Sequence, residues 1–177
     1  MDTLFFALYP PPELARRAVE FAERLRLDLG LRAKPTDAAR LHVTLHFLGA
    51  VATDAEIVAQ ASRAAGSVRS PPFDLTLDML ASFRARGRQR PLVLMAQRVP
   101  PDLQALHLEL CEALRSHAVQ ADWRGLVPHL TLLRDPVAVP EQSIAPFQWT
   151  VRDFVLIRSL VGQGRHMLLG RWPLGRQ

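Results

Sequence analysis

The chain carries one short pattern twice, and that repeat limits the folds that it can adopt. Residues Leu41 to Gly49 read L-H-V-T-L-H-F-L-G, and Pro128 to Arg134 read P-H-L-T-L-L-R. Each copy contains a histidine, an apolar residue, a threonine and another apolar residue. Alternate side chains of a β-strand share a face, so each histidine projects beside its threonine, about 6–7 Å away, while the apolar residues face a core. The repeat therefore predicts two strands, each presenting an imidazole beside a hydroxyl.

Chance explains the repeat poorly. With six histidines and seven threonines, two His-x-Thr occurrences arise at random in roughly one such chain in forty. For either copy alone, the alternative is a buried strand whose histidine and threonine hydrogen-bond each other. The two copies together favour a different interpretation. If the two motif strands lie side by side, two imidazoles share one cleft, where one can remove a proton and the other can supply one. We therefore predict that His42 and His129 are catalytic and that Thr44 and Thr131 bind substrate.

Length and composition indicate a single globular domain over residues 1–177, with 49% apolar and 22% charged residues. No apolar run approaches the roughly 20 residues of a membrane helix, and Asp2 stands where a signal peptide would be basic. The single cysteine, Cys111, excludes an internal disulfide and fits a reducing compartment. We expect a cytoplasmic monomer that does not associate with membranes.

The net charge of +5 favours a polyanionic partner such as RNA. Only Lys34 of the 22 basic residues is a lysine, and a GC-rich genome would enrich arginine without any RNA partner. The segment from Ser82 to Arg90, S-F-R-A-R-G-R-Q-R, is either an RNA-backbone contact or a solvated loop between strands. Aromatic side chains can also stack on a base. The candidate RNA contacts are Arg86, Arg88, Arg90 and Phe47, with Phe83 and Trp123 as further stacking candidates.

Apolar periodicity and the positions of Pro and Gly predict an α+β fold with largely antiparallel sheets. Helices are expected from the prolines at 10–12 to Gly30, from a capping box at Thr53 to about Gly66, and from Pro100 through Leu114. Strands are expected over residues 3–9, 41–49, 73–79, 92–96, 129–133, 147–160 and 166–172.

The remaining histidines are expected to be structural. His46 shares the strand face of His42 if the strand stays regular, and is either a partly exposed residue at the strand end or part of a cleft rim. His107 lies within the apolar stripe of the third expected helix, and His117 lies near the end of that helix. No group of His, Cys, Asp and Glu has the spacing of zinc ligands in the sequence, so we expect no catalytic metal and no cofactor.

The two motifs resemble the signatures of the two-histidine (2H) phosphoesterases, specifically the bacterial and archaeal RNA 2′,3′-cyclic phosphodiesterases, also called 2′-5′ RNA ligases. The resemblance covers nearly the whole chain. The opening L-F-F-A-L-Y-P resembles the family's first strand, and the end matches a family pattern of Ser, Gly, an aromatic residue and Trp. His166 stands where the family usually has Tyr, and Ala33-Lys34 where an aromatic residue often precedes the first motif. The matching C-terminal residues are Ser159, Gly164 and Trp172.

The resemblance implies a bilobal fold whose two lobes are related by a pseudo-twofold axis, each donating one motif strand to a central cleft. It implies hydrolysis of RNA 2′,3′-cyclic phosphate ends to 2′-phosphates, with the reverse 2′-5′ ligation also possible. It further implies that Arg134 contacts the scissile phosphate. On a regular strand Arg134 would face away from His129, so this role requires a bulge or a strand end.

A metal-independent reaction would use one neutral and one protonated imidazole, which histidine allows near neutral pH. The sequence leaves open which histidine is the acid; we favour His42 as acid and His129 as base. Two other functions remain as alternatives. One is a phosphodiesterase acting on a small cyclic nucleotide or on 2′-5′ oligoadenylate, and the other is a non-catalytic RNA-binding module.

Overall fold

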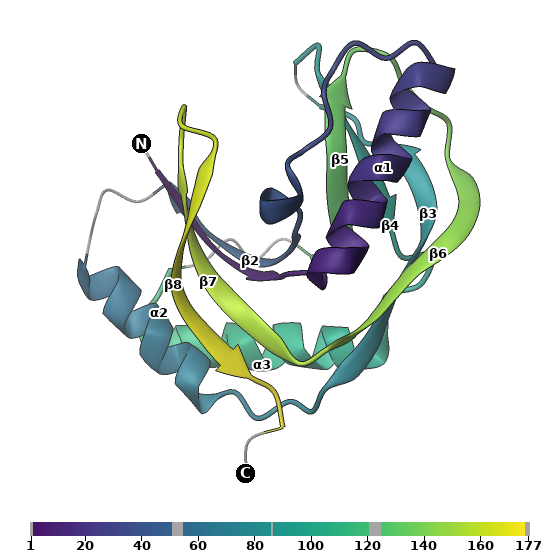
Figure 1. Ribbon diagram of the computed structural model, residues 1–177. Helices are drawn as coiled ribbons and strands as arrows, with labels where there is room; N and C mark the ends of the chain where they lie inside the picture. Colours follow the sequence, from purple (N-terminus) through teal and green to yellow (C-terminus); the bar gives the residue numbers. More distant parts are fainter. Residues whose placement is uncertain (1, 51–54, 86, 121–124, 176–177) are drawn as a thin grey trace.

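The computed structural model describes residues 2–50, 55–85, 87–120 and 125–175, so Thr53, Arg86 and Trp123 lie outside the described residues. Within these ranges the chain forms three α-helices and eight strands in an α+β arrangement (Figure 1). The helices are α1 (Pro12–Asp28), α2 (Ala55–Ser67) and α3 (Pro101–Ser116), and a short 3-10 turn spans Ala38–Arg40. The strands are β1 (Thr3–Leu8), β2 (Val43–Ala50), β3 (Phe73–Ser82), β4 (Arg90–Met95), β5 (His129–Asp135), β6 (Gln142–Val151), β7 (Asp153–Leu160) and β8 (Arg165–Pro173).

All strand pairs are antiparallel, and they form one sheet in the order β6-β3-β4-β5-β2-β1-β7-β8. The two motif strands are central neighbours, joined by the single register pair Val43–Leu130. Four strands lie on each side of that junction. We call β1, β2, β7 and β8 the His42 lobe, and β3, β4, β5 and β6 the His129 lobe. The bilobal antiparallel fold is confirmed, with the two lobes sharing a sheet at their motif strands.

The strand expected over residues 147–160 is wrong, because the chain forms two strands there in different lobes. β6 pairs with β3, whereas β7 pairs with β1 and β8, and the ladder breaks at Arg152. Figure 1 shows β6 and β7 as one long bent ribbon that crosses between the lobes. β6 also begins before the expected strand, since Pro146 is tolerated on an edge strand beside a register shift.

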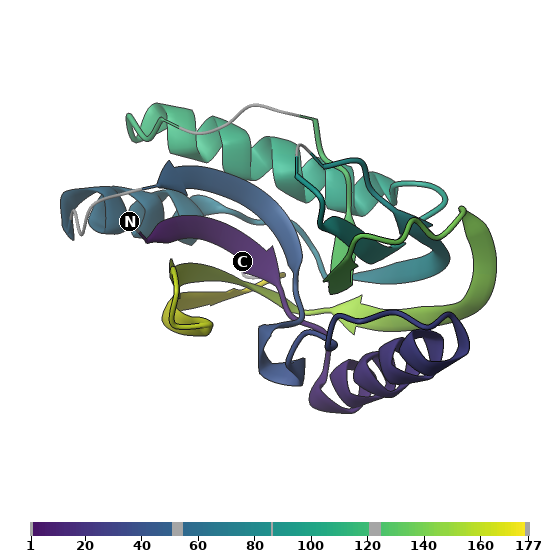
Figure 2. The same cartoon turned by 90° about the horizontal axis from the view of Figure 1, so that it is seen from above.

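Each helix buries one apolar stripe against the sheet. In α3 the stripe runs through Leu103, Leu106, Leu110 and Leu114, as its spacing predicts. α3 packs on α2 and also contacts β2 and β3, while α1 packs on β5 and β6. Figure 2 shows α2 and α3 close together and α1 on the other side of the view. Among the described residues, no helix is both long and apolar enough to cross a membrane.

Candidate active site

The two motifs meet in one small pocket at the junction of the lobes. The pair Val43–Leu130 places His42 next to Thr131, and Thr44 next to His129, across an antiparallel ladder. The two histidines are therefore diagonal neighbours, as expected for motif strands that lie side by side. The pocket has a volume of about 160 Å³ and is lined by Thr36, Arg40, His42, Thr44, His129, Thr131 and Arg134.

Both motif histidines are anchored in the same way. His42 Nδ1 lies 2.7 Å from the carbonyl oxygen of Arg40, and His129 Nδ1 lies 2.8 Å from that of Val127. A carbonyl oxygen only accepts, so each Nδ1 carries the proton and donates it. In the neutral ring, Nε2 then has a free lone pair. Each histidine thus presents Nε2 as the atom that exchanges a proton with a ligand.

Burial lowers the pKa of His42; the hydrogen bond to the Arg40 carbonyl opposes this shift, and the nearby His129 and Arg40 side chains add to it. Burial also lowers the pKa of His129, where the Val127 carbonyl opposes the shift and Arg134 adds to it. Both imidazoles are therefore neutral near pH 7 in this structure. A phosphate between them would favour protonation of one ring, since its negative charge stabilises an imidazolium.

A β-bulge turns Arg134 toward the pocket. Leu92 of β4 pairs with Leu133, but the next residue, Val93, pairs with Thr131, so Leu132 is an extra residue in β5. Leu132 and Leu133 are consecutive in the chain, and both are buried. The extra residue reverses the alternation of side chains beyond it. Arg134 therefore lines the same pocket as the motif histidines and is exposed to solvent. This is the bulge that its expected contact with phosphate requires.

Thr36 and Arg40, which were not predicted from the sequence, line the pocket from the loop before the first motif. This loop is fastened to the second motif strand. The Arg32 and Ala33 amides donate to the buried Asp135 carboxylate at 2.7 and 2.9 Å, and the Thr36 amide donates to a β5 carbonyl. The only local signal is that Arg40 lies two residues before a motif histidine.

An aromatic ring supports each motif histidine. Phe5 stacks on His42 with a centroid separation of 4.9 Å, and Phe83 meets His129 edge-to-face at 4.9 Å. Stacking of a base on Phe83 remains a prediction, and its ring already contacts a motif histidine. His166 adds a third ring, 5.1 Å from His42.

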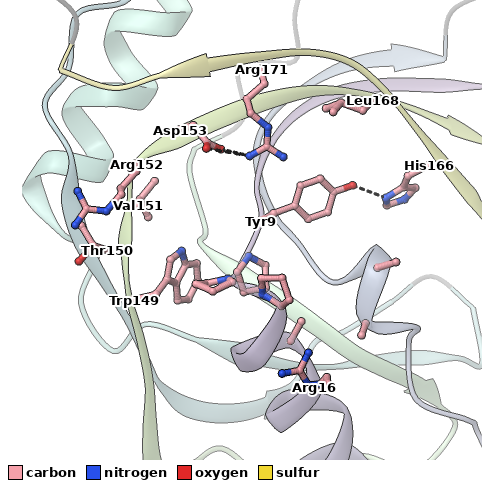
Figure 3. Close-up of a pocket in the computed structure, with 16 residues that line it drawn as sticks. Tyr9, Arg16, Trp149, Thr150, Val151, Arg152, Asp153, His166, Leu168 and Arg171 are labelled. Carbon is pink, nitrogen blue, oxygen red and sulfur yellow. Dashed lines mark hydrogen bonds and ion pairs between the residues drawn. The ribbon is translucent and has the colours of Figure 1, made fainter.

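His166, which contacts His42, also lines a larger pocket (Figure 3). Its Nδ1 shares a hydrogen bond of 3.1 Å with the Tyr9 hydroxyl. Burial, followed by the charges of His42 and Arg40, lowers the pKa of His166 to about 4, so this ring is neutral at physiological pH. The larger pocket has a volume of about 670 Å³, and Arg171 on its wall pairs with Asp153 at 2.8 Å. Further side chains on that wall include Arg16, Trp149 and Arg152.

His46 does not lie where the sequence analysis placed it. The register pairs Phe6–His46 and Ala7–Thr44 reveal a bulge in β2, which turns His46 away from the face of Thr44. Its side chain is only 2% exposed and packs against α3, where it lies close to His107 and Cys111. The spacing of these three residues in the sequence gives no sign of the group, because His46 joins His107 and Cys111 only in the folded chain.

The other candidate RNA contacts lie outside the small pocket. Phe47 is 39% exposed and is paired with Phe5, so it shares the sheet face of the His42 ring. Arg88 and Arg90 are exposed in and after the β3–β4 connection, and neither lines the pocket. Their contact with RNA remains a prediction.

Comparison with known proteins identifies the family. The family model for the 2′-5′ RNA ligase superfamily matches residues 10–163. The RNA 2′,3′-cyclic phosphodiesterase of Escherichia coli K12 is 34% identical, over 97% of this chain and 96% of that protein. The crystal structure of E. coli LigT complexed with 3′-AMP matches with a TM-score of 0.79 and 31% identity, covering 99% of each chain.

The fold recurs in a more distant protein, TT0787 of Thermus thermophilus. Its structure matches with a TM-score of 0.76 and 24% identity, covering 98% of each chain. The fold, the paired motifs in one pocket and the extent of these matches lead to one conclusion: the chain belongs to the 2′-5′ RNA ligase superfamily, the group of two-histidine phosphoesterases that its motifs resemble.

Proposed function

We propose that the protein hydrolyses 2′,3′-cyclic phosphate ends of RNA to 2′-phosphates. The observation that carries the proposal is the pair of motif histidines, each with Nδ1 anchored and Nε2 available, in one pocket with Arg134. Opening a cyclic phosphodiester requires one group that takes a proton from water and another that gives a proton to the leaving oxygen, and the two histidines can supply both. The E. coli relative is an RNA 2′,3′-cyclic phosphodiesterase, which supports this class of substrate.

The reaction is an in-line displacement at phosphorus. One Nε2 takes a proton from water as the new P–O bond forms, and the other imidazolium gives a proton to the 3′ oxygen as its bond to phosphorus breaks. We assign the base to His129 and the acid to His42. In reverse, the same groups would join the cyclic end to a 5′-hydroxyl in a 2′-5′ link, although water is the more abundant acceptor.

The polar residues around the histidines would hold the non-bridging phosphate oxygens. The Arg134 guanidinium offers a planar pair of donors that fits two oxygens at once, and the hydroxyls of Thr44 and Thr131 lie beside the imidazoles. These donors stabilise the charge that grows on the oxygens in the transition state. Arg40 and Thr36, in the loop before the first motif, would contact the phosphate from another side of the same pocket. All of these residues belong to one chain, so we infer that a monomer is sufficient.

We place the nucleoside in the larger pocket next to His166. Its wall carries the aromatic rings of Tyr9 and Trp149 together with arginine side chains, which suit a base and a neighbouring phosphate (Figure 3). The structure of E. coli LigT with 3′-AMP supports a nucleotide site on this fold.

The test uses an RNA oligonucleotide with a 2′,3′-cyclic phosphate end, and a control oligonucleotide of the same sequence ending in a 3′-phosphate. We expect the first to become a 2′-phosphate product, identified by ³¹P NMR, and the second to remain unchanged. Turnover confined to cyclic mononucleotides or 2′-5′ oligoadenylate would favour the small-nucleotide alternative. Binding of the oligonucleotide without any turnover would identify an RNA-binding module and contradict the proposal.

A further inference from the structure

A second cluster of reactive side chains lies on the opposite face of the sheet from the motif histidines. It contains His46 of β2 together with His107 and Cys111 of α3, and one potential ligand atom from each lies within 4.8 Å of the others. The register pairs Ala7–Thr44 and Phe6–His46 place Thr44 and His46 on opposite faces of β2. The cluster is therefore separate from the pocket proposed for phosphate chemistry.

The spacing of the donor atoms matches a tetrahedral metal site. Cys111 Sγ lies 3.5 Å from His46 Nδ1 and 3.6 Å from His107 Nε2. Zinc bonds of about 2.3 Å to sulfur and about 2.0–2.1 Å to nitrogen, at a tetrahedral angle, place the two donors about 3.6 Å apart. Both S···N distances agree with that value, and the two nitrogens lie within 4.8 Å of each other.

The tautomer of His107 is also set for coordination. Its Nδ1 donates to the carbonyl oxygen of Leu45 at 2.9 Å, so in the neutral ring the lone pair is on Nε2, the atom that faces Cys111. Metal-binding histidines commonly use this arrangement, in which a backbone carbonyl orients the ring through the other nitrogen. His107 and Cys111 are four residues apart on α3, which brings both onto one face of the helix.

The cluster borders a cavity beside α3. This cavity of about 850 Å³ is lined by His107 and Cys111, with Glu112 and Arg115 at its wall. His46 is buried behind them, at 2% exposure. Three protein donors and an open side would leave a fourth position for water or another small ligand.

We propose that His46, His107 and Cys111 bind a thiophilic divalent cation of the zinc class, with water as the fourth ligand. Imidazole and thiolate donors select such ions over magnesium or calcium, which prefer oxygen. On binding, the sulfur–metal bond replaces the S–H bond, and the thiol proton is released to solvent. Because one ligand belongs to β2 and two to α3, the ion would fasten α3 to the strand that follows His42.

The first experiment measures binding of Co²⁺ and Zn²⁺ to the full-length protein after treatment with a chelator. Wild type should bind one equivalent of Co²⁺ with a sulfur-to-cobalt charge-transfer band, and Zn²⁺ should displace the Co²⁺. In Cys111→Ser the band should disappear and the Zn²⁺ affinity should fall at least tenfold. His107→Gln should weaken Zn²⁺ binding similarly. The matched control is His117→Gln, whose ring contacts the Ala113 carbonyl at the end of the same helix and should leave metal binding unchanged.

A second readout keeps the test valid if one variant folds poorly. Zn²⁺ should raise the Tm of wild type and of His117→Gln, but not that of Cys111→Ser or His107→Gln, because a ligand stabilises only the state that binds it. Equal Zn²⁺ binding by wild type and both cluster variants would overturn the proposal, as would no binding by wild type. EDTA should remove the gain in Tm while turnover of a cyclic phosphate continues. If chelation abolished turnover and a divalent ion restored it, the separation from the catalytic pocket would be wrong.

Discussion

His42 and His129 are held in equivalent ways on the two sides of one pocket: in each, Nδ1 donates to the carbonyl oxygen of the residue two positions earlier. The two rings therefore have the same tautomer when neutral, and each is backed by a phenylalanine. Their surroundings differ in charge, since Arg40 and His129 act on His42 whereas Arg134 acts on His129. We therefore expect one of these histidines to act as general acid and the other as general base in the same step.

Replacing either motif histidine should remove one proton-transfer partner. We expect His42→Ala and His129→Ala each to lower kcat by about 10²–10⁴-fold on an RNA with a 2′,3′-cyclic end. The double variant should lose far less than the product of the two effects, because the groups act as a unit. Single-turnover kinetics measures these losses, and His117→Ala serves as the control. Full activity in either single variant would contradict the assignment.

Replacing Arg134 tests whether its geometry matters as well as its charge. Arg134→Lys keeps the positive charge but loses the planar pair of donors, so we expect kcat/KM on a cyclic mononucleotide to fall about tenfold or more, the usual effect of losing one charged hydrogen bond. Arg134→Gln should fall further. The matched control is Arg98→Lys, an exposed arginine that does not line the pocket. An equal effect of Arg98→Lys and Arg134→Lys would remove Arg134 from the site.

The arginines between β3 and β4 and at the start of β4 are expected to contact RNA beyond the cyclic end. Replacing Arg86, Arg88 and Arg90 together by glutamine should weaken RNA binding and flatten its salt dependence, because fewer phosphates are neutralised. Hydrolysis of a cyclic mononucleotide should barely change. Fluorescence anisotropy across a range of salt concentrations measures the first effect, and steady-state kinetics the second.

The matched control for this variant removes the same charge from three exposed arginines elsewhere: Arg24, Arg63 and Arg98. A similar loss of RNA affinity in both triple variants would indicate that overall charge, and not the connection, governs binding. Loss of mononucleotide turnover in the first variant would assign the connection to the catalytic site or to the fold.

His166 should make folding stability depend on pH. Its pKa is about 4 in the folded protein, against about 6.5 in an unfolded chain. Between these values the unfolded chain binds a proton that the folded protein does not, so stability falls as pH is lowered through this range. Replacing His166 by tyrosine, which does not titrate there, should reduce the loss. Urea unfolding of wild type and His166→Tyr at pH 7 and pH 4.5 measures the difference, and an unchanged pH dependence would contradict it.

Period-two alternation was sufficient to find the site but not to orient every residue in it. His42, Thr44, His129 and Thr131 were predictable because the bulges in β2 and β5 lie outside the three positions of each motif. Beyond those positions, bulges in β2 and β5 reverse the alternation. The bulge near Arg134 was an expected possibility, whereas nothing in the sequence predicts the bulge that places His46 on the opposite face of β2.

Other features depend on partners distant in the sequence. Thr36 lines the pocket only because its amide donates to Leu132 and because Asp135 holds the loop before it. The break between β6 and β7 also cannot be predicted from the sequence, because the apolar pattern continues through it. Only the pairing partner changes, from β3 for β6 to β1 for β7. Local periodicity carries no information about which strand will supply the partner.

The order of strands in the sheet has a consequence for synthesis of the chain on the ribosome. The His129 lobe takes its four strands from one continuous segment, β3 to β6, whereas the His42 lobe combines β1 and β2 with β7 and β8. Until β7, residues 153–160, has been synthesised, β1 lacks a neighbour on one side and presents an unpaired edge. His42 is therefore translated before His129, but the lobe that carries His42 is the last to be completed.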